Sequence, residues 1–590
     1  MNALCGARSW HSLRGEGSTD MTGAQRAADP LDRVAPTRRS RSGVRLGIGL
    51  RVPTLRRLVC IELVLALLCA AAIAAGFSMR TVLVVAVLTA AIPFVTTAGR
   101  TPFDWAVTAI RYASGWAPSV GTTTDHIDVD GNPFGVHRNG DLVSCILELR
   151  PAEGAATRLG RAGATTDSTL DLGTLARCLT QHDISLSGID VVSHGRRTAS
   201  GTPAADVYER LIGPLPAVAD RTVWVTVTAD LRSNTEAVRV RGGGSVGAAA
   251  TVRIATERVA RALDAQGVAS AVLTRNQIRD AVLHLCRGVA IDDLTQNWRT
   301  APLPGAAATG YEIDCRAIDE ELLADVWATP SLSTTVSLRL TPGAADEQVN
   351  MSGFCNLVTR SGAPALDAPG LSSMNGRHRL ALLLTLPIAV PAPGHTEPGR
   401  RIARTRASEL SPPTSGCGQL LGSDASGHGI ATRMHGRGVR SVLVAGELYL
   451  AQQLVFRAVA TGARILVRTD RPHAWRPLVD SLATPDNLRI DDGARRNGPS
   501  IDLVVQDFTD AVDVGLPSRF DGTTVLTLTE HPSLTPMRDP DVSIVQPGAA
   551  GDRVLVRTSR HDIELILVTI AQETAFIGRP RSVRNPVGTY

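Results

Sequence analysis

The sequence predicts a membrane-anchored α/β protein, in which an N-terminal two-helix transmembrane hairpin precedes mixed α/β cytosolic lobes. Residues 57–100 contain two long apolar runs separated by a short turn. Downstream, short segments rich in Val and Ile alternate with segments of helical periodicity, which is the pattern of α/β folds. Arginines gather on the outer flanks of the apolar runs, and this asymmetry sets the expected orientation.

The first element is a basic tail over residues 1–54 that we expect to be disordered. Residues 1–50 are rich in Gly, Ser, Arg and Pro and show little periodicity. Such a composition buries too little apolar surface to fold. The arginines nearest the apolar runs either rest on anionic lipid headgroups or stay solvated. Met21 is an alternative start of the chain.

The second element is the hairpin, residues 55–100. Its runs, Leu58–Phe77 and Thr81–Ala98, have 20 and 18 residues. As helices they would reach roughly 30 and 27 Å, close to the hydrocarbon thickness of a bilayer. A cleavable signal peptide rarely starts this far into a chain. A buried pair of globular helices of this length normally carries a polar stripe, which these runs lack.

The orientation follows from the arginines around the hairpin. The connecting turn holds only Arg80, whereas eight arginines lie between residues 33 and 57: Arg33, Arg38, Arg39, Arg41, Arg45, Arg51, Arg56 and Arg57. The positive-inside rule therefore predicts a protein of the cell membrane with both termini and the bulk of the chain in the cytoplasm.

Small residues in the first run suggest how the hairpin packs. Small side chains spaced four apart let helix backbones approach one another closely. The spacings in this run predict a membrane helix packing face formed by Ala70, Ala72, Ala74 and Gly76.

Residues 101–386 are predicted to form a first cytosolic α/β lobe. The stretch TPFDWAVTAIRYASGW has apolar residues at helical spacing and predicts a juxtamembrane helix. Asn139–Gly140 lies between two apolar runs and is a strong hairpin signal, and residues 151–168 are expected to form a loop. Strands and helices then alternate up to a strand expected at 378–386. One long helix in this lobe should bury a single face: Val252, Ala255, Val259 and Leu263.

A Pro- and Arg-rich linker is expected over 387–415, followed by a second α/β lobe over 416–580 and a tail over 581–590. The stretch VLVAGELYLAQQLVFRAVATGARILVRTD predicts a strand, a helix at 448–461 and a second strand, which together make a βαβ unit. Its turn contains Gly446, as a phosphate-binding P-loop would. The later Gly, Lys and Ser/Thr of that motif are replaced by Ala451, Gln452 and Gln453. We therefore expect a degenerate P-loop-like unit without ATP hydrolysis.

Composition excludes several kinds of chemistry. All 61 basic residues are arginine, and 56 acidic residues nearly balance them. The absence of lysine excludes a Schiff base, a P-loop lysine and a lysine general base. Arginine does not interleave with aromatic residues, so no nucleic-acid partner is expected. The nine cysteines form no Cys-x-x-Cys pair, as expected of reduced thiols rather than of disulfides or a zinc site.

Three short motifs resemble ligand-binding loops but lack required features. GCGQLLGSD at 416–424 has the glycines of a dinucleotide site without its strand–turn–helix context, so we expect a turn into a strand. RGGGS at 241–245 precedes a long helix and could hold an anion, although a flexible helix entry is the simpler interpretation. HIDVDG at 126–131 places His126 and His137 at the first and twelfth positions of a calcium loop, so we expect a turn.

Polar residues at strand ends are the remaining candidates for chemistry. No nucleophile elbow or zinc-binding helix accompanies them, and structural roles are expected for Ser193, His194, Cys417, His428 and His435. Asp470 and Asp507 each follow a strand, a common position for aspartate. We therefore expect no catalytic residue, no cofactor and no metal site.

Several ordered segments resemble one family. Over roughly residues 55–580, the chain looks like the EccE component of actinobacterial type VII (ESX) secretion systems. The resemblance implies a non-catalytic subunit at the periphery of the membrane complex, whose partners are the pore-forming and ATPase components and membrane lipids. The segments that carry it are QHDISLSGIDVVSHGRR, YERLIGPLPAVADRTVWVTV, GVASAVLTRNQI, GCGQLLGSD, VAGELYLAQQLVFRAVATGARILVRTDRPHAW and ILVTIAQETAFIG.

Two hypotheses about function follow. The first is a structural subunit of a secretion membrane complex that stabilises or assembles the export machinery. The second is a membrane-tethered enzyme that uses its α/β lobes on a nucleotide or a nucleotide-sugar. The second requires a convergent set of carboxylates or phosphate-binding groups at the carboxyl ends of strands.

Overall fold

The computed structural model describes residues 48–50, 55–80, 82–84, 86, 95–97 and 100–578, with internal gaps. The gaps are residues 315–316, 346, 361–365, 367, 392–399, 494–499, 510–521, 531–538 and 548–550. The chain divides into two compact units, Met1–Leu46 and Gly47–Tyr590, and all described residues belong to the second. Apart from residues 48–50, the tail expected to be disordered lies outside the described residues.

Helix α1 (Leu55–Ala74) forms most of the first apolar run. It ends in a Schellman motif, because the N–H of Gly76 donates to the carbonyl of Ile73 (3.0 Å) and the N–H of Phe77 donates to that of Ala72 (3.2 Å). Gly76 has a φ of +79°, a left-handed conformation that glycine adopts without steric cost. The helix therefore ends before the predicted end of the run.

The second apolar run is only partly described. Its last residues form strand β2 (Val95–Thr97), which pairs antiparallel with β1 (Ile48–Leu50). The helix predicted up to Ala98 is therefore wrong at this end, and the tail contains a short strand. The β-branched residues of β2 favour an extended backbone. Among the described residues, no helix combines the length and the hydropathy that a bilayer crossing needs.

The predicted juxtamembrane helix is confirmed as a helix, α3 (Pro102–Ala113). A capping box at Thr101 satisfies the first backbone N–H groups of the helix. Trp105 and Tyr112 contact the ring of Trp298, at centroid distances of 6.1 and 5.3 Å. This helix is therefore docked on the first lobe.

The first sheet contains 13 strands within the described part of the chain, and all its paired strands run antiparallel. Its main path is β12-β13-β15-β14-β9-β10-β5-β4-β3. The hairpin predicted at Asn139–Gly140 is confirmed as the β4–β5 connection. The bounds are β3 (Thr122–Ile127), β4 (Pro133–Asn139), β5 (Leu142–Leu149), β8 (Thr180–Gln181), β9 (Ile184–Arg196), β10 (Asp220–Asp230), β11 (Ser270–Val272), β12 (Ala301–Leu303), β13 (Ala306–Ile313), β14 (Ser333–Pro342), β15 (Gln348–Thr359), β16 (Leu371–Ser373) and β17 (Arg400–Ala403).

Helices cover both faces of this sheet. Successive residues of a strand point to opposite faces, and neighbouring residues of β10 contact different helices. Val223 and Val225 join the core of α7 (Gly244–Asp264), whereas Trp224 joins the core of α8 (Arg275–Leu285) and α10 (His378–Leu384). The predicted buried face of α7 is confirmed by four fully buried residues: Val252, Ala255, Val259 and Leu263. The smaller helices are α4 (Leu172–Arg177), α6 (Thr235–Val240) and α9 (Glu320–Ala328).

The strand predicted at 378–386 is wrong, because this segment forms α10. Its residues 380–384 are all buried, and a helix enclosed by protein has no polar side to reveal a helical period. Gly310 on β13 permits the close approach of this helix. A Cβ at Gly310 would lie 2.1 Å from the Cβ of Ala381.

The second sheet contains 12 of the described strands, in the order β22-β21-β23-β24-β20-β25-β26-β27-β18-β19-β6-β7. The strands from β22 to β25 are parallel and the others are antiparallel. The mixed α/β architecture is thus confirmed. The bounds are β18 (Gln419–Ser423), β19 (Gly429–Thr432), β20 (Ser441–Ala445), β21 (Ile465–Thr469), β22 (Leu488–Ile490), β23 (Leu503–Asp507), β24 (Thr524–Thr529), β25 (Val542–Val545), β26 (Arg553–Thr558) and β27 (Asp562–Leu567), with helices α12 (Leu448–Thr461), α13 (Pro472–Leu482) and α14 (Ala571–Ile577).

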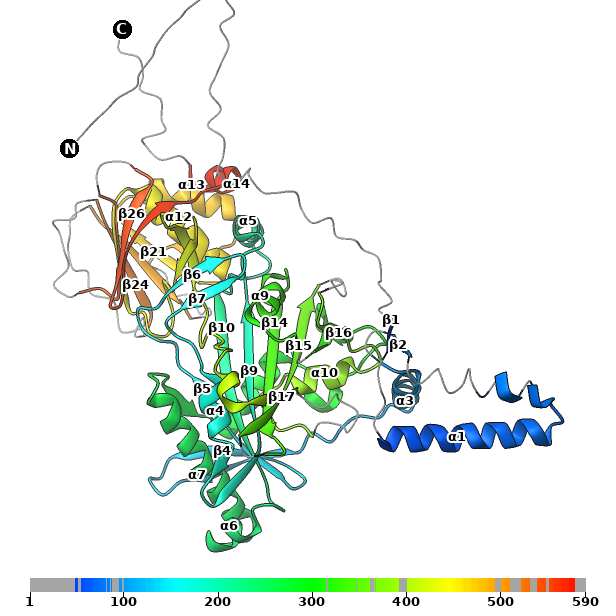
Figure 1. Cartoon of the computed structure of the whole chain (residues 1–590). Helices are drawn as coiled ribbons and strands as arrows, with labels where there is room; N and C mark the ends of the chain where they lie inside the picture. The colour runs from blue at the N-terminus through cyan, green and yellow to red at the C-terminus, as the bar shows by residue number, and fades with distance from the viewer. Residues whose placement is uncertain are drawn as a thin grey trace, which may run out of the picture. The chain divides into compact units, whose positions relative to one another are not determined.

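Two segments connect the lobes in ways that the sequence did not predict. The expected loop at 151–168 contains β6 (Ala156–Gly160) and β7 (Gly163–Thr166), and β6 pairs with β19 of the second sheet. These strands, cyan in Figure 1, form one end of the second sheet, and α5 (Pro203–Ile212) packs on α12. Part of the expected linker forms β17 and α11 (Arg404–Ala407), and β17 pairs with β15 of the first sheet. Each lobe therefore includes a segment from the other side of the predicted boundary.

Candidate functional site

The carboxyl edge of the parallel strands is where α/β proteins usually bind ligands. The predicted βαβ unit is confirmed as β20–α12–β21. The N–H of Gly446 donates to the carbonyl of Thr529 (2.9 Å), and the N–H of Glu447 donates to Oε1 of Gln546 (3.1 Å). A P-loop keeps such N–H groups for phosphate; here they are bonded within the chain. Ala451 and Gln453 are fully buried.

Asp507 ends β23 at this edge and is nearly completely buried. Its carboxylate accepts from Nε and Nη2 of Arg471 (as close as 2.8 Å), from Nε1 of Trp475 (2.7 Å) and from Oγ1 of Thr469 (3.0 Å). Arg471 also contacts Glu530 at 2.7 Å. The hydrogen bonds that Arg471 donates to Asp507 raise the pKa of Arg471. The cluster is closed, because its donors and acceptors satisfy one another.

Asp470, the other strand-end aspartate, is exposed. It accepts the backbone N–H of Thr509 at 2.8 Å, and this bond lowers the pKa of its carboxyl group. The structure therefore gives Asp470 a loop-fastening bond, whereas Asp507 belongs to the closed cluster.

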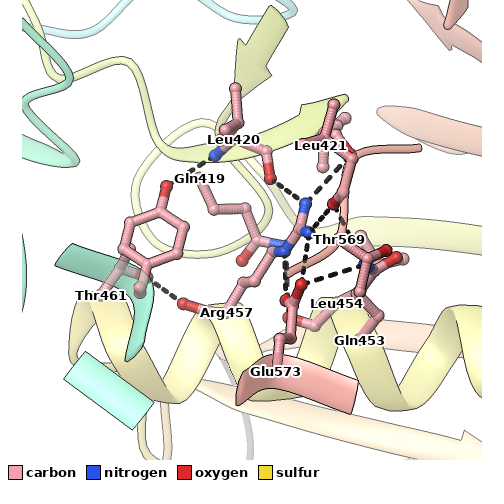
Figure 2. A network of polar contacts seen from close by, with 11 residues as sticks. Gln419, Leu420, Leu421, Gln453, Leu454, Arg457, Thr461, Thr569 and Glu573 are labelled. Atoms are coloured by element: carbon pink, nitrogen blue, oxygen red, sulfur yellow. Dashed lines mark hydrogen bonds and ion pairs between the residues drawn. The ribbon is translucent and has the colours of Figure 1, made fainter. Parts of the chain in front are cut away.

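A second polar cluster, which the sequence analysis missed, lies inside the same lobe. Arg457 on α12 and Glu573 on α14 are both fully buried, and Nε and Nη2 of Arg457 donate to the two carboxylate oxygens at 2.7 and 2.9 Å (Figure 2). Nη1 donates to the carbonyls of Leu420 (2.8 Å) and Leu421 (3.0 Å), and Nη2 also donates to the carbonyl of Val568. All the N–H directions of this guanidinium therefore have acceptors.

Further side chains extend this network in Figure 2. Gln453 donates to Oε2 of Glu573 (3.3 Å) and to Oγ1 of Thr569 (3.1 Å). The hydroxyl of Tyr208, on α5, accepts the N–H of Leu420 at 2.7 Å, and burial raises the pKa of that hydroxyl. The network joins α5, α12, α14 and β18, so its chemistry is that of a buried tie between elements. Arg457 is the only charged residue of α12, and a lone charge in a largely apolar helix was the signal that could have revealed the network.

The polar strand-end residues named in the sequence analysis lie apart from one another. His194 contacts Oγ1 of Thr335 at 2.8 Å, and burial lowers its pKa to about 3. Burial raises the pKa of Cys417 to about 11, so its thiol is a poor nucleophile. His428 lies 3.7 Å from Asp424 in the β18–β19 turn.

Two of the three loop-like motifs form the turns predicted from the sequence, and the third, RGGGS, leads into α7 as predicted. Gly418 (φ +74°) turns the chain into β18. Gly243, at the start of α7, has no side-chain cap and a φ of +67°. Asp128 forms a turn by accepting the N–H groups of Asp130 and Asn132, and it pairs with Arg253 at 3.0 Å. These contacts fix backbone turns.

A cleft of about 1280 Å³ is lined by residues of both lobes. Three ion pairs lie in its lining: Arg196 with Asp220 at 3.3 Å, Arg464 with Asp502 at 3.2 Å, and Arg437 with Glu148. His435 also lines it, and burial lowers the pKa of this histidine. The lining carries charges of both signs, which points to no particular ligand.

The predicted membrane packing face divides into two parts. Ala70, Ala72 and Ala74 lie on α1, with Ala70 and Ala74 exposed and Ala72 half-buried. Gly76 lies beyond the last residue of the helix and forms its terminating turn.

Comparison with known proteins gives consistent matches. The family model described as "Putative type VII ESX secretion system translocon, EccE" matches residues 217–313, from just before β10 to the end of β13. The ESX-2 secretion system protein EccE2 of Mycobacterium tuberculosis (strain CDC 1551 / Oshkosh) is 25% identical over 514 residues, which cover 83% of this chain and 91% of that protein.

Two further relatives match shorter parts. The ESX-5 secretion system protein EccE5 of Mycobacterium marinum is 25% identical over 299 residues, 48% of this chain and 72% of the relative. The ESX-1 secretion system protein EccE1 of Mycolicibacterium smegmatis is 31% identical over 153 residues, 26% of this chain and 32% of the relative. The resemblance predicted from the sequence is confirmed by these matches.

Proposed function

We propose that this chain, which resembles EccE proteins over most of its length, is a non-catalytic membrane subunit of a type VII (ESX) secretion complex. It stabilises or assembles the export machinery through packing surfaces, and its partners are the pore-forming and ATPase components. The observation that carries the proposal is the similarity over 83% of the chain to a protein named as an ESX-2 secretion system component.

The carboxyl edge of the second sheet supports a non-catalytic role. An enzyme that uses a nucleotide or a nucleotide-sugar needs open donors and acceptors there. The N–H groups of Gly446 and Glu447 and the carboxylate of Asp507 are instead bonded within the chain. These bonds weigh against the alternative of a membrane-tethered enzyme.

Exposed apolar side chains support a membrane position for the hairpin. Left in water, such surface costs about 25 cal/mol per Å² relative to burial. Seven large apolar side chains in this region are more than half exposed: Leu63, Leu67, Ile73, Phe77, Met79, Leu83 and Val84. With the flanking arginines, they favour the topology with both termini and the bulk of the chain in the cytoplasm.

The membrane helix packing face is now proposed to consist of the three alanines on α1, without Gly76. Ala70 and Ala74 are four residues apart on α1, so they share one side of the helix. Ala72 offers a second small position, whereas Gly76 serves to end the helix. Contacts at these alanines would join the anchor to a neighbouring membrane helix.

Purification of the tagged full chain from gently solubilised membranes tests the proposal. Mass spectrometry should find other secretion subunits with it, and deletion of the chain should abolish secretion. Failure to copurify any secretion subunit would contradict the proposal.

The alternative enzyme is tested with Asp470→Asn. Asp470 is exposed and holds one loop N–H, so this variant should fold, assemble and secrete normally. A folded and assembled Asp470→Asn chain that cannot secrete, or specific magnesium-dependent ATP binding in calorimetry, would favour the enzyme.

A further inference from the structure

Helix α3 has an exposed apolar face. Phe103 and Ile110 lie seven residues apart, which is two helical turns, and they are 53% and 68% exposed. Ala106 and Ala113 continue the same exposed stripe, and Trp116, just beyond the helix, is 41% exposed. The opposite face is fixed to the first lobe by Trp105 and Tyr112. The apolar stripe is therefore held outward by a rigid support.

The surroundings of α3 are rich in tryptophan, tyrosine and arginine. Of the seven Trp and five Tyr residues in the sequence, four gather here: Trp105, Tyr112, Trp116 and Trp298. Arg100 lies over the ring of Trp105 (5.2 Å) and Arg111 over that of Trp116 (4.6 Å). Trp and Tyr are enriched where membrane proteins cross the lipid–water interface. The helix also begins only four residues after the predicted end of the second apolar run.

A narrow pocket opens beside Trp116, and three guanidinium groups line it: those of Arg111, Arg377 and Arg379. Its volume of about 20 Å³ admits one oxygen-sized group, since a water molecule needs at least roughly 10–15 Å³ on this measure. A larger anion would therefore rest at its mouth with one oxygen inside.

Within the described part of the chain, two of the arginines that line the pocket carry a hydrogen-bond donor without a partner. Nε of Arg377 and Nε of Arg379 are buried and have no partner among the described residues. Arg377 contacts the carboxylate of Glu312 at 3.6 Å and also feels the charge of Asp104, and Arg379 donates through Nη2 to the carbonyl of Ile291. Unbonded buried donors are uncommon in folded proteins, and guanidinium groups bind phosphate with charge-assisted hydrogen bonds.

We propose that this pocket binds the phosphate of an anionic phospholipid, while the apolar stripe of α3 and Trp116 enter the adjoining lipid layer. One phosphate oxygen enters between Arg377 and Arg379, and Arg111 lies at the rim. The helix then fixes the first lobe against the membrane surface at a set angle. This inference rests on the proposed membrane function and adds a ligand class and a site to it.

Equilibrium binding of phosphatidylglycerol to the full chain in detergent tests the pocket. Arg377→Gln with Arg379→Gln should weaken binding by roughly fivefold for each arginine, the ratio that corresponds to about 1 kcal/mol for one basic residue at an anionic surface. The matched control, Arg279→Gln with Arg299→Gln, removes the same charge from exposed positions outside the pocket and should bind as the parent does. If both double variants weaken the binding of phosphatidylglycerol equally, the proposed phosphate site is wrong.

Quenching of tryptophan fluorescence by brominated lipids in vesicles tests the helix face. Phe103→Ser with Ile110→Ser should lower the quenching, and these exposed side chains can be changed without disturbing the core. The control is Val240→Ser with Val246→Ser, positions of similar exposure on α6 and α7, and it should leave quenching unchanged. If Phe103→Ser with Ile110→Ser leaves the quenching unchanged, the proposed contact between α3 and lipid is wrong.

Three outcomes separate the two proposals. Inorganic phosphate that competes equally well with the lipid would identify a free-phosphate site and overturn the lipid assignment. A membrane-integral chain whose pocket variant binds lipid as the parent does would overturn this inference alone. A chain that does not fractionate with membranes would overturn the proposed function as well.

Discussion

Replacing Arg457 by methionine removes five hydrogen bonds at one step, two to Glu573 and three to backbone carbonyls. Methionine fits the volume of the arginine stem but carries no donor. The carboxylate of Glu573, which is buried beneath α12, then has no cation beside it. Within the network of Figure 2, only the side-chain N–H of Gln453 still donates to the carboxylate of Glu573.

The expected loss is large. Removing one partner of a buried ion pair typically costs about 3–5 kcal/mol, because the other charge stays buried without compensation. Domain stabilities are about 5–15 kcal/mol in total, so Arg457→Met should remove a large share of the stability of the second lobe. The double variant Arg457→Met with Glu573→Met leaves no unpaired charge and should recover part of that loss, although the carbonyls of Leu420 and Leu421 still lose the bonds from Arg457.

Urea unfolding of the full chain, together with hydrogen exchange of peptides from α12 and α14, measures both variants. Exchange should accelerate in these two helices while peptides of the first sheet stay protected. The reasoning is refuted if Arg457→Met costs less than about 1 kcal/mol, since that is the range of an exposed pair. It is also refuted if the double variant is less stable than the single one.

Three other predictions follow from the topology, the packing and the titration of the chain. A reporter that is active only in the cytoplasm, fused after Tyr590, should be active, and a periplasmic signal alone would overturn the proposed topology. Gly310→Ala should cost about 1–3 kcal/mol in urea unfolding because its methyl group would overlap Ala381, whereas Gly163→Ala, which meets open space, should be nearly neutral. His378 accepts the N–H of Gly310 through Nδ1 (3.1 Å), and burial lowers its pKa to about 4. Because this pKa lies below that of the unfolded chain, about 6.5, the contribution of His378 is complete above pH 6.5 and is lost as the pH falls toward 4. We expect a loss of about 2 kcal/mol between about pH 7 and 5, and His378→Gln should flatten that slope.

Local patterns predicted the elements whose signals are local. The helix at 448–461 was predicted with the bounds of α12, because a buried strand, a turn at Gly446 and a second strand frame it within a few residues. The hairpin at Asn139–Gly140 was likewise visible in a single dipeptide. Both are cases in which neighbouring residues alone determine the backbone.

The predictions that failed share one physical cause: residues far away in the sequence determine the structure of these segments. Residues 380–384 are all apolar because protein surrounds them, so their pattern could not separate a helix from a strand. β6 pairs with a strand about 270 residues later, and Arg457 meets Glu573 more than 100 residues away. The pocket beside α3 also depends on contacts between segments far apart in the sequence, because Arg111 and Arg377 line it together.

The pairing of β6 with β19 has a consequence for synthesis. A ribosome adds about 5–20 residues per second, so β6 emerges roughly 15–55 s before its partner strand exists. α5 likewise waits for α12, and an unpaired strand edge is a site of aggregation during that interval. β6 and α5 must therefore stay free to pair with β19 and α12 while the rest of the first lobe folds. A truncated chain that starts at the connector near residue 400 would lack these early pieces, and it would expose the edge of β19 and the side of α12 that they cover.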